Sequence, residues 1–201
     1  STALGCGYTI DPIKHNTSHF MITVIYAHPY PSHSKTNRIL CDAISNLPDV
    51  QIRSLYDLYP DFHINAQAER DALKDTHTIV LQHPMHWYHA PALLSLWFEK
   101  VLSHGWAYGE GGDALRGKRL LWACTTGGDA AAYSGTGDSH FSIEHISVPI
   151  QQTALFCGMA WQPPFIVHDA RNLDETQLLN VSEAYRDRLV AELTHITSGS
   201  K

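Results

Sequence analysis

The sequence has few cysteines, and none lie close enough together to suggest a small disulfide scaffold or a structural zinc site. Its 201 residues include Cys6, Cys41, Cys124 and Cys157, and no two of them form a CxxC motif. Structural zinc sites and small disulfide scaffolds both rely on closely spaced cysteines, so the pattern argues against either. A chain of this length can bury one hydrophobic core without disulfides or a structural metal. Because no disulfides are indicated, we expect a reducing environment.

Clusters of basic residues and long hydrophobic runs are also missing. The chain has 14 Lys and Arg against 20 Asp and Glu, a net charge of -6 with neutral His, and its basic residues are scattered. We therefore expect no nucleic-acid partner. No apolar run approaches the roughly 18 to 20 residues of a membrane-spanning helix. These features predict a soluble, cytoplasmic protein that binds small molecules.

Residues 1–20 show neither a regular amphipathic pattern nor the charged and apolar regions of a signal peptide. Met21 begins the first clear strand. We therefore predict a poorly ordered N-terminal extension over residues 1–20 and a single domain over residues 21–197.

Apolar runs of strand length alternate with helical patterns from Met21 onward. Strands are expected over 22–27, 50–55, 78–81, 119–125 and 165–167, and helices over 39–47, 65–74, 91–102, 143–157 and 176–193. Continuous apolar strands that alternate with helices are typical of βαβ units. The pattern predicts an α/β fold: a doubly wound, five-stranded parallel sheet with helices on both faces.

In such a sheet, ligands bind beyond the carboxyl ends of the strands. Three loops follow predicted strands: AHPYPSHSKTN (27–37), QHPMHWYHAP (82–91) and TTGGDAAAYSGTGDSH (125–140). Because parallel strands end at the same edge of a sheet, we expect all three loops to lie together on one rim.

The first of these loops is rich in hydroxyl groups and contains neither a GxGxxG nor a P-loop motif. Ser32, Ser34 and Thr36 lie where a helix is expected to begin, so their side chains and the free N–H groups of that helix could hold a phosphate. His28 and Asn37 could add donors. The alternative is that Ser34 is only a helix N-cap and that the prolines only stiffen a turn.

The other two loops suit a flat ring. Thr125 to Gly128 end a buried strand with two hydroxyls and two glycines, which let the backbone approach a ligand, although the glycines could instead serve only a turn. The middle loop offers flat, polarizable surface from Pro84, Met85, Trp87 and Tyr88. This combination favours a heteroaromatic ligand.

Three histidines, His83, His86 and His89, are spaced three apart in the middle loop. They would share a face only on a helix, and prolines at 84 and 91 bracket them in a loop, so we predict no metal site. We expect His83 to bond backbone groups at the end of its strand and His86 to lie on the rim.

Several longer stretches resemble a known family. IYAHPYPSHSKTN, SLYDLYPDFHIN, LRGKRLLWACTTGG and WQPPF are similar to the flavodoxin-like NAD(P)H:quinone oxidoreductases, and within that family to the ancillary proteins of glutathione-regulated potassium-efflux systems. The resemblance covers nearly the whole domain. It implies a flavodoxin-like fold that binds FMN, with FAD as the alternative, and takes electrons from NADH or NADPH.

The resemblance also implies roles for particular residues. The flavin phosphate would be held by His28, Ser34, Lys35, Thr36 and Asn37. The isoalloxazine ring would be flanked by Pro84, Met85, His86, Trp87, Tyr88, Thr125, Thr126, Gly127 and Gly128. The loop over 125–140 is longer than expected for the efflux-system proteins and is similar to that of DT-diaphorase-type quinone reductases, which implies that Tyr133 and His140 contact the quinone.

The implied activity is a two-electron hydride relay through flavin to a quinone. One helix cannot bury all the aromatics of the region that contains Trp97, Phe98, Trp106 and Tyr108, so we expect a homodimer. In the resembling family the active site lies at the dimer interface and aromatic residues of the second subunit close the pocket, which makes Trp106 and Tyr108 candidates for that role. A membrane potassium-efflux antiporter is a further implied partner, which would place the protein at the inner membrane. The alternative function is that of a one-electron, flavodoxin-type carrier.

Overall fold

The computed structural model describes residues 21–198. The N-terminal extension predicted over residues 1–20 lies outside the described residues. Within residues 21–198, six strands form one sheet: β1 (Ile22–Tyr26), β2 (Val50–Ser54), β3 (Thr78–Pro84), β4 (Arg119–Thr125), β5 (Ala160–Trp161) and β6 (Phe165–Val167). All pairings in the sheet are parallel, and the strands follow the order β2-β1-β3-β4, with β5 and β6 both paired to β4.

β5 and β6 together occupy the fifth strand position that the sequence predicts. Ala160 and Phe165 face Arg119 and Ala123 in the pairing, so one extra residue lies between the two short strands. Pro163 and Pro164 fall in this gap. Proline has no N–H to donate, and it interrupts a ladder at an edge or a bulge. The predicted five-stranded, doubly wound sheet is therefore confirmed, with its edge strand divided in two.

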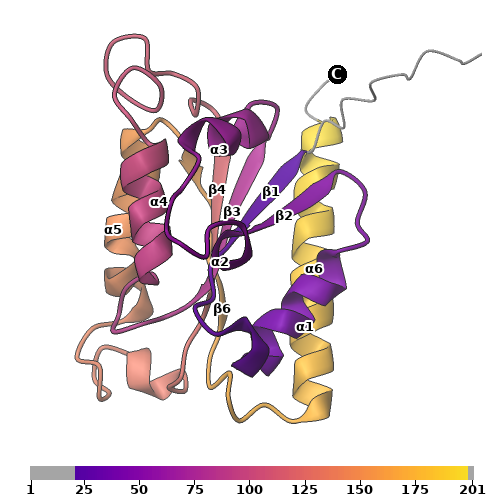
Figure 1. Cartoon of the computed structure of the whole chain (residues 1–201). Coiled ribbons are helices and arrows are strands. Elements are labelled where there is room, and N and C mark those ends of the chain that lie inside the picture. The colour runs from indigo at the N-terminus through magenta and orange to yellow at the C-terminus, as the bar shows by residue number, and fades with distance from the viewer. Residues whose placement is uncertain (1–20, 199–201) are drawn as a thin grey trace, which may run out of the picture.

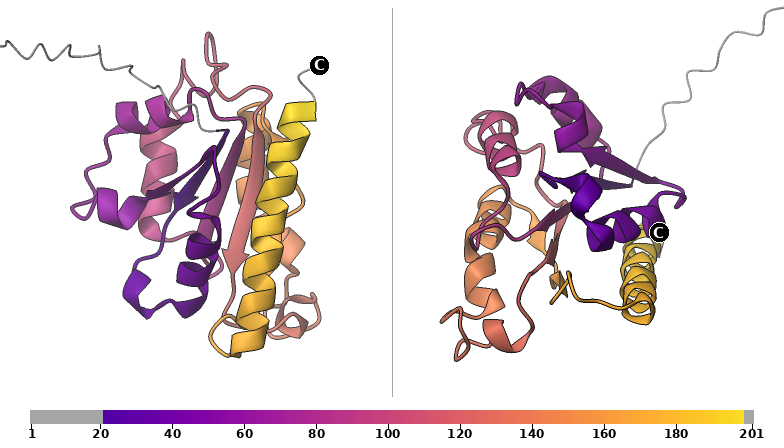
Figure 2. Two further views of the ribbon diagram at one scale, coloured as in Figure 1. Left: turned by 90° about the vertical axis from the view of Figure 1, so that its right-hand side faces the viewer. Right: turned by 60° about the horizontal axis from the view of Figure 1, so that its bottom comes forward.

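Helices cover both faces of the sheet (Figures 1 and 2). α1 (Lys35–Ile44) and α6 (Glu175–Ser198) pack together on one face. α3 (Ala66–Leu73), α4 (Ala92–Val101) and α5 (Ile143–Phe156) cover the other. None of the helices in the described part of the chain is both long and apolar enough to cross a membrane.

Short helices join these elements: η1 (Pro31–His33), α2 (Leu55–Leu58) and η2 (Ala131–Tyr133). The apolar pattern did not predict α2, because a single helical turn leaves too short a period to recognise. β3 is also longer than predicted, since Gln82 and His83 belong to the strand and are buried.

Each face of the sheet has its own hydrophobic core. On the α1 and α6 side, Leu40, Ile44 and Tyr185 pack against the strands. On the other side, Leu94 and Trp97 of α4 join a larger cluster. Burying apolar surface stabilises a fold by roughly 25 cal/mol per Å². The central strands are buried on both faces, and their sequences are therefore continuous apolar runs.

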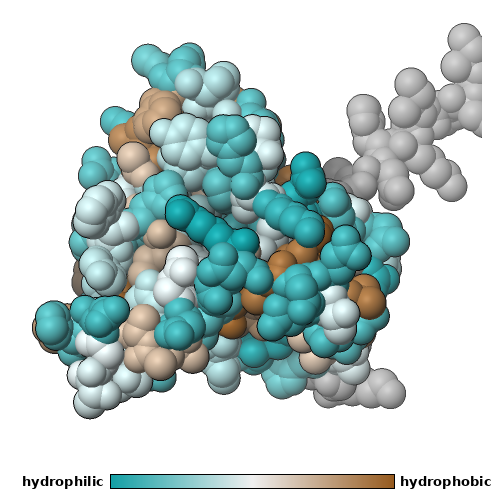
Figure 3. Space-filling view, turned by 90° about the horizontal axis from the view of Figure 1, so that it is seen from below, coloured by the Kyte–Doolittle hydropathy of each residue, from teal (hydrophilic) through white to brown (hydrophobic). Residues whose placement is uncertain are grey.

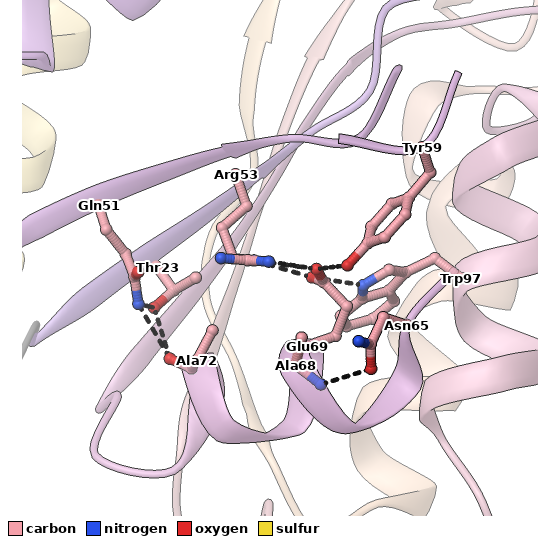
Figure 4. Close-up of polar contacts among 9 residues, drawn as sticks. All are labelled: Thr23, Gln51, Arg53, Tyr59, Asn65, Ala68, Glu69, Ala72 and Trp97. Atoms are coloured by element: carbon pink, nitrogen blue, oxygen red, sulfur yellow. Dashed lines mark hydrogen bonds and ion pairs between the residues drawn. The ribbon is translucent and has the colours of Figure 1, made fainter. Parts of the chain in front are cut away.

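One buried carboxylate links four segments on the α4 side of the sheet (Figure 4). Glu69 of α3 is fully buried and pairs with Arg53 of β2. It also accepts hydrogen bonds from the Tyr59 hydroxyl, at 2.5 Å, and from Trp97 Nε1 of α4, at 3.0 Å. A charge is tolerated in a core only when it is paired and hydrogen-bonded, and here both carboxylate oxygens have partners.

Candidate functional site

A cavity of about 620 Å³ opens at the carboxyl ends of the strands. This edge of the sheet is at the bottom of Figure 1, and Figure 3 views it directly, with hydrophobic residues showing between hydrophilic ones near its middle. The cavity is lined by His28, Tyr30, His33, Ser34, Lys35, Thr36, Asn37, Pro84, Met85, His86, Thr125, Thr126, Gly127, Ala170, Arg171, Leu173 and Leu178. The prediction that the three loops share one rim is confirmed.

The first turn of α1 forms one end of the cavity. Ser34 is the N-cap, and its hydroxyl accepts a hydrogen bond from Asn37 N at 3.2 Å. The N–H groups of Lys35 and Thr36, at the start of the helix, have no preceding turn to bond. Free N–H groups at the positive end of a helix dipole suit an anion such as a phosphate.

Asn37 connects this turn to the loop after β4. Its Nδ2 donates to Thr125 Oγ1 at 2.9 Å, although Asn37 lies 88 residues away in the sequence. The Asn37 side chain is 2% exposed, and its Oδ1 has no hydrogen-bond partner within the described residues. Leaving a buried polar atom unpaired costs about 1–3 kcal/mol, so this amide lining the cavity is suited to a polar ligand.

His28 lies in the same end of the cavity and is held as a neutral ring. Its Nδ1 accepts a hydrogen bond from Tyr30 N at 3.0 Å. Burial, with a smaller contribution from the neighbouring His86 and His33, lowers the pKa of His28 to about 4. With Nδ1 acting as acceptor, the ring proton resides on Nε2, which can donate to a ligand.

His83, in contrast, is a residue of the core. Trp122 Nε1 donates to His83 Nε2 at 2.8 Å, so Nδ1 carries the proton and donates to Pro84 O at 2.9 Å. Burial lowers the pKa of His83 to about 4. The prediction that His83 bonds the backbone at the strand end is confirmed, and its second partner is an indole that sequence spacing could not reveal.

The middle loop forms a tight hairpin. His86 and His89 exchange backbone hydrogen bonds of 2.9 and 2.8 Å, which places Trp87 and Tyr88 at the tip with φ values of 48° and 66°. Two bulky residues in the left-handed region are strained. Trp87 is 89% exposed. Both tip residues lie outside the cavity lining, and their predicted contact with flavin stays a prediction.

In the third loop, Tyr133 packs closely against Gly128. A Cβ on Gly128 would lie 3.2 Å from the Tyr133 ring, whereas one on Gly127 would meet open space. The Tyr133 ring stacks on His168, with ring centroids 5.6 Å apart. Burial raises the pKa of Tyr133, so its hydroxyl keeps its proton near neutral pH. Gly128 and Tyr133 therefore form a packed unit beside the cavity lining, while Gly127 belongs to it.

His140 is exposed, has a φ of 58° and lies outside the cavity lining. Within the described residues His140 and Tyr133 share no hydrogen bond, although the residues before them are joined by a bond from Ser139 N to Ala132 O at 3.2 Å. Their roles stay predictions.

Sequence reasoning missed a fourth loop. Ala170 and Arg171 follow β6 and line the cavity, together with Leu173 and Leu178. Tyr30 and His33 of the first loop were also missed. The available signal was the predicted strand at 165–167: the rule that placed the other loops on the rim applies to its loop as well.

The structure corrects the role given to Trp97. This residue is 2% exposed and donates to Glu69 within the same chain, so it is not available at an interface. Phe98, Trp106 and Tyr108 are half-buried.

Comparison with known proteins identifies the class. The family model described as a flavodoxin-like fold matches residues 21–189, and the chain belongs to this family. A curated relative, the glutathione-regulated potassium-efflux system ancillary protein KefF of Salmonella newport, is 49% identical over 183 residues, covering 87% of this chain and 99% of the relative.

Solved structures agree on the fold and carry varied names. One described as a thermophilic tryptophan halogenase from Streptomycin violaceusniger has a TM-score of 0.81 and 34% identity, covering 83% of this chain and 97% of that one. General stress protein 14 of Treponema denticola in complex with FMN has a TM-score of 0.77 and 32% identity, covering 84% of this chain and 95% of that one. An NADPH-quinone reductase from P. pentosaceus has a TM-score of 0.77 and 28% identity, covering 84% of this chain and 97% of that one.

Proposed function

We propose that this protein is an FMN-dependent NAD(P)H:quinone oxidoreductase that also serves as an ancillary component of a potassium-efflux system. Proteins with different activities share this fold, so the fold alone does not decide the reaction. The proposal is supported by the cavity, by the FMN complex and the quinone reductase among similar structures, and by the likeness to KefF.

The observation that carries the proposal is the polar end of the cavity. The N-cap hydroxyl of Ser34, the N–H groups at the start of α1 and the unpaired Oδ1 of Asn37 converge there. The Ser34 hydroxyl and the N–H groups suit the phosphate of FMN, and the Asn37 oxygen can accept a hydrogen bond from a ribityl hydroxyl. At the other end, Met85, His86 and the open side of Gly127 leave room for a flat ring.

A bound flavin would supply the redox chemistry, accepting a hydride from NADH or NADPH and passing it to a quinone. The residues of this chain hold and orient it. Backbone N–H groups beside Gly127 and Gly128 would face the polar edge of the ring, where negative charge develops. Tyr133, which keeps its proton, would donate to a quinone oxygen.

Two measurements test the proposal. Mass spectrometry of flavin released from the purified protein should give the mass of FMN, and the mass of FAD would contradict that part. Steady-state oxidation of NADH and NADPH with menadione, with and without added flavin, should show turnover that depends on flavin. A one-electron carrier would bind flavin and show no such turnover.

The ancillary role has a separate test. The likeness to KefF suggests a membrane antiporter as partner, which would hold the protein at the inner membrane. Co-purification of the full chain with a potassium-efflux antiporter from detergent-solubilised membranes is the expected result. Recovery of the chain only without the antiporter would contradict this role and leave the reductase activity to stand alone.

A further inference from the structure

Arg171 is a cation at the cavity with no assigned role. It lies in the loop after β6, and its guanidinium has no hydrogen bond or ion pair to any residue among 21–195. Among the described residues, Lys35 is the other Lys or Arg in the lining and no Asp or Glu lines the cavity, although the whole chain carries a net charge of -6. Two unneutralised cations without a facing carboxylate make the cavity attractive to anions.

The fold holds Arg171 in place through its neighbours. Asn172 N bonds Asp169 O at 3.0 Å, which closes a turn with Ala170 and Arg171 at its corners. Ala170 O accepts from Thr36 Oγ1 at 2.6 Å, and Ala170 N donates to Thr126 O at 3.0 Å. The residue before Arg171 is therefore tied both to the first turn of α1 and to the end of β4.

This tie places Arg171 beside the end of the cavity that suits an anion. α1 starts there, and the N–H groups of its first turn are free to donate to an anion. The charge of Arg171 also acts on His86, another lining residue, whose pKa is lowered by burial and then by Arg171. Arg171 thus lines the same cavity as the first turn of α1 and the middle loop.

We propose that Arg171 is a specificity-determining residue of the cavity, which selects flavins that carry a phosphate monoester over flavins that carry none. Arginine presents paired N–H donors that match two phosphate oxygens. Its partner would be the phosphate of FMN, beside Lys35 and the start of α1, while the ring would contact the middle loop and Gly127. This inference rests on the proposed FMN site.

Flavin titration of the flavin-free protein separates phosphate binding from ring binding. Quenching of flavin fluorescence gives the affinity for FMN, for riboflavin and for FAD. In Arg171→Gln we expect FMN affinity to fall by about 10- to 100-fold, the usual effect of one charge-assisted hydrogen-bonding group, and riboflavin affinity to stay within about twofold. The FMN affinity of the variant should also depend less steeply on salt.

Two further variants serve as controls. Arg38→Gln removes the same charge from an exposed position on α1 outside the cavity lining, and both affinities should be unchanged. Arg171→Lys keeps the charge and loses the paired donors, so its FMN affinity should fall between those of the parent and Arg171→Gln. Thermal unfolding of all variants should match that of the parent, because Arg171 is exposed.

The outcomes are distinguishable. Equal loss of FMN and riboflavin affinity in Arg171→Gln, or no loss of either, would overturn the inference while leaving the proposed function intact. Loss of FAD affinity alone would place Arg171 against a second phosphate and would also overturn it. If the parent protein binds neither FMN nor FAD, the proposed function itself fails.

Discussion

Burial decides which side chains around the cavity carry charge. His28 and His83 have pKa values of about 4, so both imidazoles are neutral at pH 7. Burial also raises the pKa of Tyr133, which keeps its phenol protonated. Lys35 and Arg171 therefore bring positive charge to the lining at neutral pH, and the neutral ring of His28 acts there as a hydrogen-bond partner.

The buried neutral His83 predicts a loss of stability in acid. Its pKa is about 4 in the folded protein and about 6.5 when unfolded, so between these values the unfolded chain binds the extra proton. The stabilisation is complete above pH 6.5 and is lost as the pH falls toward 4. Between pH 7 and pH 5 this single group should cost about 2 kcal/mol of unfolding free energy.

Urea unfolding at a series of pH values measures this effect. His83→Gln should be less stable than the parent at pH 7, by about 1–3 kcal/mol for the lost hydrogen bonds, and should show a flatter dependence on pH. The exposed His63 offers a control, since His63→Gln should keep the slope of the parent. An unchanged slope in His83→Gln would contradict the assignment.

Tyr133 and His140 are predicted to act on the quinone. Tyr133→Phe keeps the ring that stacks on His168 and removes only the hydroxyl. Rapid mixing should show quinone reoxidising the protein-bound flavin about 10- to 100-fold more slowly, the effect of one donor lost near developing charge, with flavin content retained. His140→Ala is expected to slow the same step.

If both variants react at the parent rate, the assignment is wrong. His86 in the cavity lining, or an aromatic residue of a second subunit, then becomes the better candidate for the donor.

At the scale of elements, a few polar side chains set how the helices meet the sheet. Arg70 of α3 donates to Val101 O and Lys100 O at the end of α4, and its guanidinium lies over the Trp106 ring. Glu69, one residue earlier in the chain, bonds Trp97 in the middle of the same helix. α3 therefore anchors α4 at two points, and α4 follows directly from the hairpin of the middle loop.

Removing the charge of Glu69 should weaken this anchor. In Glu69→Gln the guanidinium of Arg53, 19% exposed, loses its ion pair in a largely buried site. We expect a loss of about 3 kcal/mol of unfolding free energy, typical of breaking a buried pair, measured by urea unfolding at pH 7. Glu99→Gln, on the exposed face of α4, should stay within about 0.5 kcal/mol of the parent. Parent-like stability of Glu69→Gln would show that the pair contributes nothing net.

At the scale of the whole molecule, two aromatic residues predicted to close the pocket lie far from it. Trp106 and Tyr108 belong to the segment that joins α4 to β4, at the amino edge of the sheet, opposite the cavity (Figure 1). They can reach a cavity of this kind only in a second copy of the chain. Tyr108 packs on Phe156, which is 63% exposed at the end of α5.

The exposed apolar side of α5 is therefore the predicted dimer surface. Val148 and Leu155 are seven residues apart and share a face of the helix, with Phe156 beside them. Val148→Asp should shift the sedimentation coefficient from dimer to monomer at micromolar concentration, because a buried unpaired charge is costly. Leu179→Asp, at an exposed apolar position on α6, is the matched control and should remain dimeric.

A parent protein that sediments as a monomer at micromolar concentration would refute the dimer itself. A Val148→Asp variant that stays dimeric would move the interface to another face of the molecule.

The sequence by itself determined the fold class and most of the rim. Continuous apolar strands, helices between them and the parallel-sheet rule were sufficient to predict the sheet and to place the loops over 27–37, 82–91 and 125–140 on one rim, and part of each loop lines the cavity. Ser34 as the N-cap of α1 also follows from local chemistry. These features depend on residues close together in the chain, whose preferences can be read directly from their order.

Only the tertiary structure decided which distant side chains meet. Thr36 and Ala170 are 134 residues apart, and their hydrogen bond brings Arg171 to the cavity. The hydrogen bond from Trp122 sets the tautomer of His83, and the hydrogen bond from Trp97 to Glu69 holds the indole ring in the core. No local pattern encodes these pairings, because each depends on the position of two elements that packing places side by side. The charge of the cavity and the burial of its histidines are therefore properties of the folded molecule.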